Sequence, residues 1–179
     1  MERKDYSNAP THIFVDNCPY FITASIYKKQ HLLKDSGLKE LLLDCIQSSF
    51  ERYQWELHHW VILNNHYHLL GKSHKGTDLP KIIKQIHSVS GYHIKKHTQV
   101  EQPIWWNYWG YCPSNEKDYL IHLNYLFNNP VKHQYVENIN TYPFSSFHQF
   151  IKKQGRENLV RQFKENSDYK NLYSDKDDY

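Results

Sequence analysis

Two stretches of the sequence carry side chains that are suited to chemistry on a phosphate group. In the first, His66 and His68 are separated by a single residue. Residues i and i+2 of a β-strand point to the same side, so both imidazoles can reach one metal ion. The chain contains 13 histidines, however, and about one His-x-His pair is expected by chance in such a composition. The pair alone therefore leaves a metal site and an accidental pattern both open.

The second stretch is a predicted helix from residue 116 to residue 129. Four of its polar side chains lie within about 60° of one another at 100° per residue: Asp118, His122, Tyr125 and Asn129. Tyr125 and Asn129 are one turn apart, so a nucleophile and a metal ligand could approach one phosphate together. The alternative is a solvated helix face, because the chain has 15 tyrosines and any one of them can be structural.

We predict that the two stretches meet in space. His66, His68 and Asn129 would then hold a divalent metal, and Tyr125 would attack a DNA phosphate beside it. Two imidazoles and an amide oxygen suit Mg²⁺ or Mn²⁺, of which Mn²⁺ accepts imidazole more readily. The ion would polarise the scissile phosphate as a Lewis acid. A tyrosine with a pKa of about 10 is a weak nucleophile at pH 7, so the metal or His122 would have to help remove its proton. Alternatively, His122 could contact the DNA.

The elements that must position these side chains follow from hydrophobic periodicity and turn residues. The predicted elements, in chain order, are a strand over residues 18–27, a helix over 37–53, a hairpin of strands over 55–63 and 66–72, a helix over 79–97, a strand or ordered loop over 103–113, and the helix from 116. We expect Pro130 to end the last helix near Asn129. This order predicts an α+β fold, a ferredoxin-like sandwich of an antiparallel sheet with helices packed on one face.

Length and composition set further bounds. The 179 residues are predicted to form one main domain over 1–150, with a loose arm at 1–12, and a C-terminal helical segment with a mobile polar tail over 151–179. The three cysteines have no close pair, which argues against a disulfide framework and favours the cytoplasm. No run approaches 18 consecutive apolar residues, so neither a signal peptide nor a membrane span is expected.

Both stretches resemble motifs of a known family. His66-Tyr67-His68 is similar to the HUH motif, in which the middle residue is bulky and apolar. The stretch 122–130, continued by Val131-Lys132-His133, resembles the catalytic helix of REP-associated tyrosine transposases, which are single-tyrosine HUH transposases of the bacterial insertion-sequence type. The resemblance extends from about residue 20 to residue 147. It includes Trp105-Trp106-Asn107 and Pro143-Phe144-Ser145-Ser146-Phe147.

The sequence departs from the family pattern in two places. Asn64-Asn65 stands where the family often has Pro-Asn or Pro-Asp. Residues 108–114 contain no Arg or Lys, whereas the family often has an Arg-rich stretch before the catalytic helix. These departures bear on DNA specificity more than on the chemistry.

The resemblance implies specific roles. Tyr125 matches the nucleophile that forms a covalent 5′-phosphotyrosine link with single-stranded DNA and frees a 3′-OH. His66 and His68 match the two metal histidines, and Asn129 matches the third ligand. The family fold is the ferredoxin-like sandwich, its substrates are imperfect DNA hairpins with a short guide sequence, and its wider group includes both monomers and homodimers.

Contact with hairpin or single-stranded DNA requires cationic and aromatic side chains. The net charge of +3 is too small to prove a nucleic-acid partner. Lys81, Lys84 and Lys95 fall on one side of the helix over 79–97, and we predict that they contact phosphates, as does Lys132. Four aromatic residues could stack on unpaired bases: Trp105, Trp106, Trp109 and Tyr111. The alternatives are an ordinary solvated face for the lysines and core packing for the tryptophans.

These observations together predict metal-dependent nicking of single-stranded DNA and strand transfer through a phosphotyrosine, as in DNA transposition. Two other functions stay open at this point. One is a domesticated protein that binds hairpin DNA without cleaving it. The other is a metal-dependent hydrolase in which water is the nucleophile. No membrane partner is expected.

Overall fold

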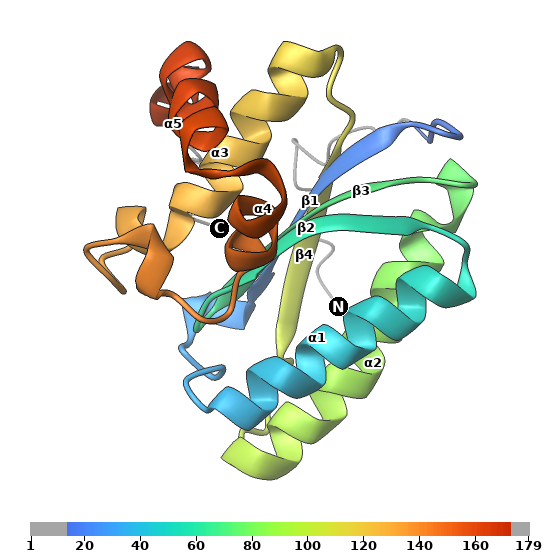
Figure 1. Cartoon of the computed structure of the whole chain (residues 1–179). Helices are drawn as coiled ribbons and strands as arrows, with labels where there is room; N and C mark the ends of the chain where they lie inside the picture. The colour runs from blue at the N-terminus through green and yellow to red at the C-terminus, as the bar shows by residue number, and fades with distance from the viewer. Residues whose placement is uncertain (1–13, 173–179) are drawn as a thin grey trace.

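The computed structural model describes residues 14–172, and its first six major elements follow the order β-α-β-β-α-β (Figure 1). They are β1 (Pro19–Ile26), α1 (Ser36–Arg52), β2 (Glu56–Ile62), β3 (His66–Lys72), α2 (Leu79–Thr98) and β4 (Trp105–Tyr111). The strands form one antiparallel sheet in the order β2-β3-β1-β4. This is the predicted ferredoxin-like arrangement, and it places β1 and β3 at the centre.

The prediction that helices cover one face of the sheet is wrong. Helices α1 and α2 cover one face, and α3 (Glu116–Lys132), α4 (Phe147–Gln154) and α5 (Arg156–Glu165) lie on the other (Figure 1). Alternation along β1 shows why both faces need cover. Tyr20 and Ile22 are buried in the core under α1 and α2, whereas Phe21 is buried in the core under α3. Successive strand residues point to opposite faces, so a strand with apolar residues on both faces requires a layer of helices on each.

Helix α3 does not end at Asn129, as the sequence predicted, but continues to Lys132. Pro130 has no N–H to donate, so it leaves a backbone carbonyl one turn earlier without its helical partner. The backbone bonds after it are nevertheless formed, from His133 N to Asn129 O at 3.0 Å and from Tyr135 N to Pro130 O at 2.9 Å. The extra turn carries Lys132 to a position seven residues, or about two turns, after Tyr125.

The segment predicted as a strand or an ordered loop is β4, an edge strand. Its register with β1 contains an irregularity, because Ala24 faces Tyr108 whereas Ile26 faces Trp105. Between these two pairs, one residue of β1 (Ser25) opposes two of β4 (Trp106 and Asn107), which reverses the side to which the first β4 residues point. Tyr111 consequently faces α3, whereas Trp105 packs against α2.

The C-terminal segment, from α5 onward, packs against α3. Residues 164–172, expected as part of a mobile tail, form the end of α5 and a 3₁₀ turn η4 (Ser167–Asn171), in which Tyr169 is buried. The buried Asn124 side chain links α3 to this C-terminal segment, because its Nδ2 lies 3.3 Å from Gln162 O and 3.2 Å from Asn166 O. The predicted arm at 1–12 and the end of the tail at 173–179 lie outside the described residues.

Within residues 14–172, none of the helices is long and apolar enough to cross a membrane.

Candidate active site

The two histidines of the HUH-like motif open β3 directly after the Asn64-Asn65 turn, and both point toward α3. Each is anchored through Nδ1. His66 Nδ1 lies 2.7 Å from the side-chain oxygen of Asn65, and His68 Nδ1 lies 2.8 Å from the hydroxyl of Thr23 on β1. Such contacts fix the orientation of an imidazole and select which nitrogen carries the proton. They leave Nε2 as the nitrogen with which His66 meets α3.

Burial keeps both imidazoles neutral. It lowers the pKa of His66 to about 3, with a further contribution from the nearby His133. The pKa of His68 is lowered well below its ordinary value, also by burial first and then by His66 and His133. A neutral imidazole keeps a lone pair on one nitrogen, which is the form that binds metals.

Asn129 of α3 meets His66 across the space between the helix and the sheet. The distance between His66 Nε2 and Asn129 Oδ1 is 3.0 Å. A neutral imidazole has one N–H, and if His66 donates it to Asn65, two lone pairs face each other at this distance. A cation between them, or a rotated amide that turns Nδ2 toward the ring, removes the repulsion. Among the described residues, Asn129 Nδ2 has no hydrogen-bond partner.

Tyr125 lies beside the histidines, one helical turn before Asn129. Its ring packs edge-on against His68, with 5.5 Å between the ring centroids. Its hydroxyl accepts a hydrogen bond of 3.0 Å from Lys132 Nζ, which also lies 4.8 Å from the centre of the ring. Tyr125 is only 5% exposed. The structure thus brings together the two stretches that the sequence singled out, and it adds a cation at the tyrosine oxygen.

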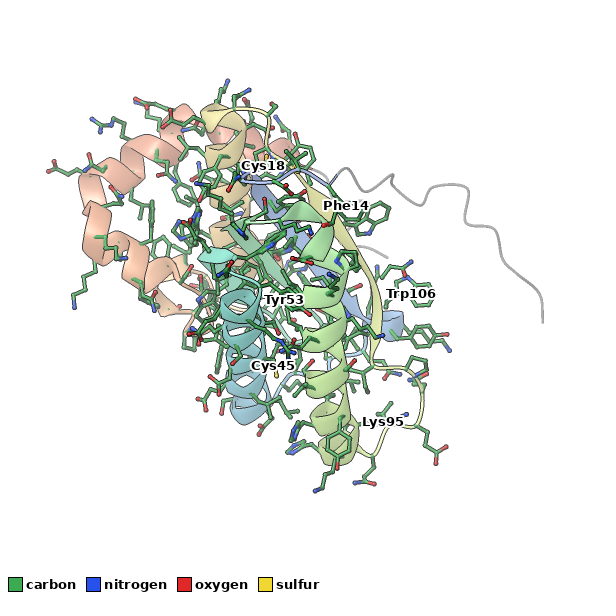
Figure 2. The ribbon with its side chains drawn as sticks, turned by 90° about the vertical axis from the view of Figure 1, so that its right-hand side faces the viewer. Phe14, Cys18, Cys45, Tyr53, Lys95 and Trp106 are labelled. Carbon is green, nitrogen blue, oxygen red and sulfur yellow. The ribbon has the colours of Figure 1, made fainter. Side chains whose placement is uncertain are left out.

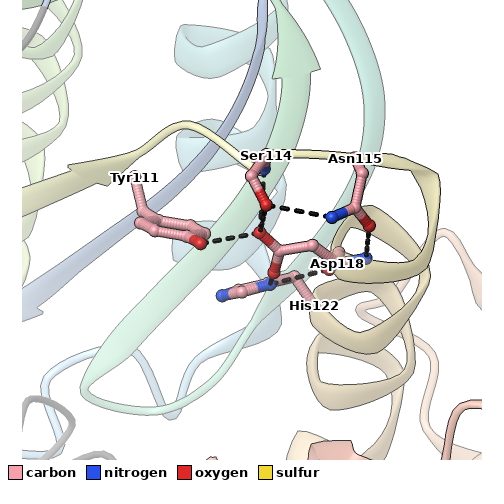
Figure 3. Close-up of polar contacts among 5 residues, drawn as sticks. All are labelled: Tyr111, Ser114, Asn115, Asp118 and His122. Atoms are coloured by element: carbon pink, nitrogen blue, oxygen red, sulfur yellow. Dashed lines mark hydrogen bonds and ion pairs between the residues drawn. The ribbon is translucent and has the colours of Figure 1, made fainter.

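His122, the predicted proton acceptor, is engaged elsewhere (Figure 3). Its Nδ1 lies 3.1 Å from the carboxylate of Asp118 and 2.9 Å from the Asp118 carbonyl oxygen. Its ring is stacked on Tyr111 at 4.7 Å and packs on Phe21 at 5.0 Å. Phe21 also contacts Tyr125, at 6.1 Å. His122 is therefore near Tyr125 through Phe21, whereas Lys132 donates a hydrogen bond to the tyrosine oxygen.

The other predicted DNA contacts lie on the α2 side of the sheet, away from the histidines. Lys84 and Lys95 line a shallow hollow of about 380 Å³ beside Trp105, and Lys81 is paired with Asp78 at 2.7 Å. Figure 2 shows Lys95 on α2 and Trp106 on β4 at the same side of the molecule.

The two tryptophans are partly covered. Trp105 stacks on His87 at 4.5 Å and donates from Nε1 to the Ser90 hydroxyl at 3.0 Å. Trp106 packs on Tyr27 at 5.1 Å. Each indole thus packs against at least one protein ring, and Trp105 also contacts Tyr67, with 5.3 Å between the ring centroids.

Sequence reasoning missed the position of Lys132 and the anchoring roles of Thr23 and Asn65. The spacing of seven residues between Tyr125 and Lys132 places both on one helical face, but the expected end of the helix at Asn129 concealed it. The link from Thr23 to His68 depends on strand register, to which no local pattern points.

A model of the family described as "Transposase IS200 like" matches residues 14–129. This chain belongs to the IS200-like transposase family. The match begins before β1 and ends at Asn129, so it includes both histidines and Tyr125. The predicted resemblance is thereby confirmed.

Curated relatives of this transposase carry related names. The REP-associated tyrosine transposase of Escherichia coli (strain K12) is 27% identical over 143 residues, which cover 77% of this chain and 81% of the relative. A putative REP-associated tyrosine transposase of Haemophilus influenzae (strain ATCC 51907 / DSM 11121 / KW20 / Rd) is 31% identical over 119 residues, which cover 57% of this chain and 64% of the relative.

A solved structure of a REP-associated tyrosine transposase bound to a REP hairpin has the same fold. Its TM-score to this transposase is 0.67 at 24% identity, and the match covers 79% of this chain and 84% of the other.

Proposed function

We propose that this transposase nicks single-stranded DNA at hairpins and transfers the strand through a covalent 5′-phosphotyrosine on Tyr125, in a reaction that depends on a divalent metal. The observation that carries the proposal is the convergence of two distant segments. Asn129 of α3 lies 3.0 Å from His66 Nε2, and Tyr125 of the same helix packs on His68. Membership of the IS200-like family supports DNA transposition as the setting.

The proposed step exchanges one phosphodiester for another. The Tyr125 oxygen forms a bond to phosphorus, and the bond from phosphorus to the 3′-oxygen of the neighbouring nucleotide breaks. The tyrosine proton passes to solvent, and the freed 3′-oxygen takes up a proton to become a 3′-OH. Strand transfer is the reverse exchange with a 3′-OH of another DNA end, so it needs no external energy source.

His66, His68 and Asn129 would hold the metal, Mg²⁺ or Mn²⁺. The donor set fits such an ion: two imidazoles are kept neutral by burial, and an amide oxygen faces one of them. His66 Nε2 and Asn129 Oδ1 lie 3.0 Å apart, so both atoms could bind one ion. When bound, the ion would supply Lewis acidity at the phosphate.

No group of three or more His, Cys, Asp or Glu side chains within residues 14–172 is placed to hold a metal. The amide of Asn129 is therefore needed to complete a set of three protein ligands with the two histidines.

Lys132 would assist the nucleophile. An ammonium 3.0 Å from the Tyr125 oxygen favours the negative charge that develops there as the proton leaves. The same hydrogen bond holds the hydroxyl in one direction, which reduces the number of orientations that the tyrosine must search. The sequence assigned Lys132 to a DNA phosphate, and we now propose this second role for it.

Lys81, Lys84 and Lys95 are proposed phosphate contacts on α2. Lys81 already pairs with Asp78, so we expect Lys84 and Lys95 to contribute more. Replacing both of the latter with Ala should flatten the salt dependence of binding, with a loss of about 0.7 in the log–log slope per contact on single strands. The Lys81→Ala variant is the matched control, with a smaller change. An unaltered slope in the double variant removes α2 from the DNA interface.

The proposed function is tested with DNA hairpins that flank the gene, incubated with the protein and Mg²⁺ or Mn²⁺ and resolved on a denaturing gel. We expect a covalent protein–DNA adduct with the wild type and none with Tyr125→Phe. Binding without cleavage would indicate a domesticated hairpin-binding protein. Cleavage without an adduct, retained in Tyr125→Phe, would indicate a hydrolase that uses water.

A further inference from the structure

Two rows of side chains cross the face of the sheet that lies under α3. In one row, Thr23 of β1 is opposite His68 of β3 and Trp109 of β4. In the next row, Phe21 of β1 is opposite Leu70 and Tyr111. Phe21 and Thr23 are two residues apart, so the rows share one face and are separated by about 7 Å.

Helix α3 crosses these two rows and a third row that contains His66, which is opposite Ser25. Asn129 meets His66 at 3.0 Å, Tyr125 packs on His68 at 5.5 Å, and His122 packs on Phe21 at 5.0 Å. His122 is therefore one row along from the proposed nucleophile. An extended DNA strand that placed a phosphate at Tyr125 and ran along β1 would bring its next nucleotide to His122.

The groups around His122 are suited to binding an anion and an aromatic ring. Asp118 accepts hydrogen bonds from the Tyr111 hydroxyl at 2.7 Å, from Ser114 N at 2.8 Å and from the Ser114 hydroxyl at 3.1 Å, and it holds His122 Nδ1 at 3.1 Å (Figure 3). These bonds fix the carboxylate behind the imidazole. Tyr111 stacks on His122 with one face and is 44% exposed.

The tautomer of His122 follows from the same contacts. Its Nδ1 lies 2.9 Å from the Asp118 carbonyl oxygen, which can only accept, so Nδ1 carries the hydrogen. In the neutral ring, Nε2 is then an acceptor and cannot bind a phosphate oxygen. In the protonated ring, Nε2 donates, and the Asp118 carboxylate stabilises the positive charge.

We propose that Tyr111, Asp118 and His122 form a flanking subsite for the nucleotide next to the scissile phosphate, in which His122 binds the phosphate of that nucleotide and the Tyr111 ring stacks on its base. The ligand is single-stranded DNA, and the inference rests on the proposed function. Asp118 is a positioning residue that orients the imidazole and supports its charge.

The charged and titratable groups that face His122 are few. Asp118 comes from its own helix and Tyr111 from β4, while β1 contributes the uncharged Phe21. Burial alone would raise the pKa of Asp118, but the hydrogen bonds from Tyr111 and Ser114 outweigh it and lower this pKa. The carboxylate thus stays ionised in the pH range in which an imidazole titrates.

The test is a scan with modified DNA. Hairpins with single-stranded flanks, taken from the sequence beside the gene, carry one uncharged methylphosphonate at a time on either side of the cleavage position. Affinity is measured by fluorescence anisotropy in a Tyr125→Phe background that keeps the DNA intact. We expect one flanking position at which the modification weakens binding about tenfold, as for a charge-assisted hydrogen bond. In a His122→Asn background, the modification at that position should no longer change the affinity.

Variants of Tyr111 separate stacking from hydrogen bonding. Tyr111→Phe keeps the ring and should retain most of the affinity, whereas Tyr111→Ala should lose about tenfold, as expected when a stacking ring is removed. Weakening by His122→Asn that is equal for all modified positions would show a purely structural role and overturn the subsite.

The two proposals fail in different ways. A wild-type adduct on the denaturing gel together with no phosphate-specific effect of His122 overturns the subsite and leaves the proposed function standing. Absence of the adduct overturns the proposed function itself, and absence of hairpin binding overturns both.

Discussion

The two faces of the sheet are made from the same strands but hold different kinds of residues. On the face under α1 and α2, β3 presents Tyr67 and Leu69 to a largely apolar core. On the face under α3, the same strand presents His66 and His68 beside Thr23. Because neighbouring residues of a strand point in opposite directions, a histidine and a leucine that are adjacent in sequence serve different layers. Both layers contain a buried apolar core, but only the layer under α3 also contains the residues of the proposed chemistry.

Substitution on the α3 face should have the largest effect on activity. His68→Ala removes a proposed metal ligand, and we expect the rate of adduct formation to fall by about 10²–10³-fold, as on loss of one electrostatic contact in an active site. The rate is measured by quenched time courses on denaturing gels. His58→Ala, on the edge strand β2, is the matched control and should keep the wild-type rate. A His68→Ala variant that is as active as this control would contradict the site.

The adjacent residue should show the opposite behaviour. Leu69 is fully buried in the core under α1 and α2, and Leu69→Ala should lower the free energy of unfolding by about 2–5 kcal/mol. Denaturant titration measures this change. The adduct rate per folded molecule should stay near that of the wild type at a temperature at which the variant is folded. Loss of rate without loss of stability would show that the two faces are not separate in function.

Lys132 tests how far the chemistry extends along α3. Lys132→Met keeps the aliphatic length but removes the charge-assisted hydrogen bond to Tyr125, which is worth about 1.5–3 kcal/mol. We expect the adduct rate to fall by about 10- to 100-fold with little change in DNA affinity. Lys117→Met, on the same helix, is the control. A change in affinity alone would return Lys132 to the role of a phosphate contact.

A last prediction concerns stability, pH and the α2 face. Burial lowers the pKa of His87 to about 3. The imidazole therefore stays unprotonated in the folded protein, whereas in the unfolded chain it takes up a proton below its ordinary pKa of 6.5. The unfolded state then binds more protons, so stability decreases as the pH falls from 6.5 toward 3. In His87→Gln this decrease should be shallower, by up to about 1.4 kcal/mol per pH unit.

Denaturant titrations between pH 6.5 and pH 4 measure this slope, and the exposed His97→Gln is the control. Equal slopes in the two variants would mean that His87 does not resist protonation in the fold.

Much of the fold could be predicted because its signals are local. The turn residues Asn64-Asn65 marked the start of β3 at His66, and leucine spacing marked α1. The second layer of helices was missed, because alternation identifies two faces of a strand but does not say what covers a face that is itself apolar. The end of α3 was missed because Pro130 usually stops a helix, whereas here the turn after it is held by backbone bonds to Asn129 and Pro130.

The candidate site was predictable in its residues and not in its contacts. His66, His68, Tyr125 and Asn129 could be singled out by type and spacing, and the fold brings them together. The link from His122 to Asp118 and the bond from Lys132 to Tyr125 depend on rotamers and on the length of α3. The DNA contacts of the lysines on α2 remain predictions. These lysines lie on the opposite face of the sheet from the histidines.

The most direct test of the central claim is to locate the DNA on the protein. The adduct formed with hairpin DNA and Mn²⁺ is digested with trypsin and nuclease, and the modified peptide is sequenced by mass spectrometry. Among the 15 tyrosines of the chain, we predict that the nucleotide is attached through a 5′-phosphate to Tyr125 alone. Attachment to another residue, or an adduct that persists in Tyr125→Phe, would contradict the account.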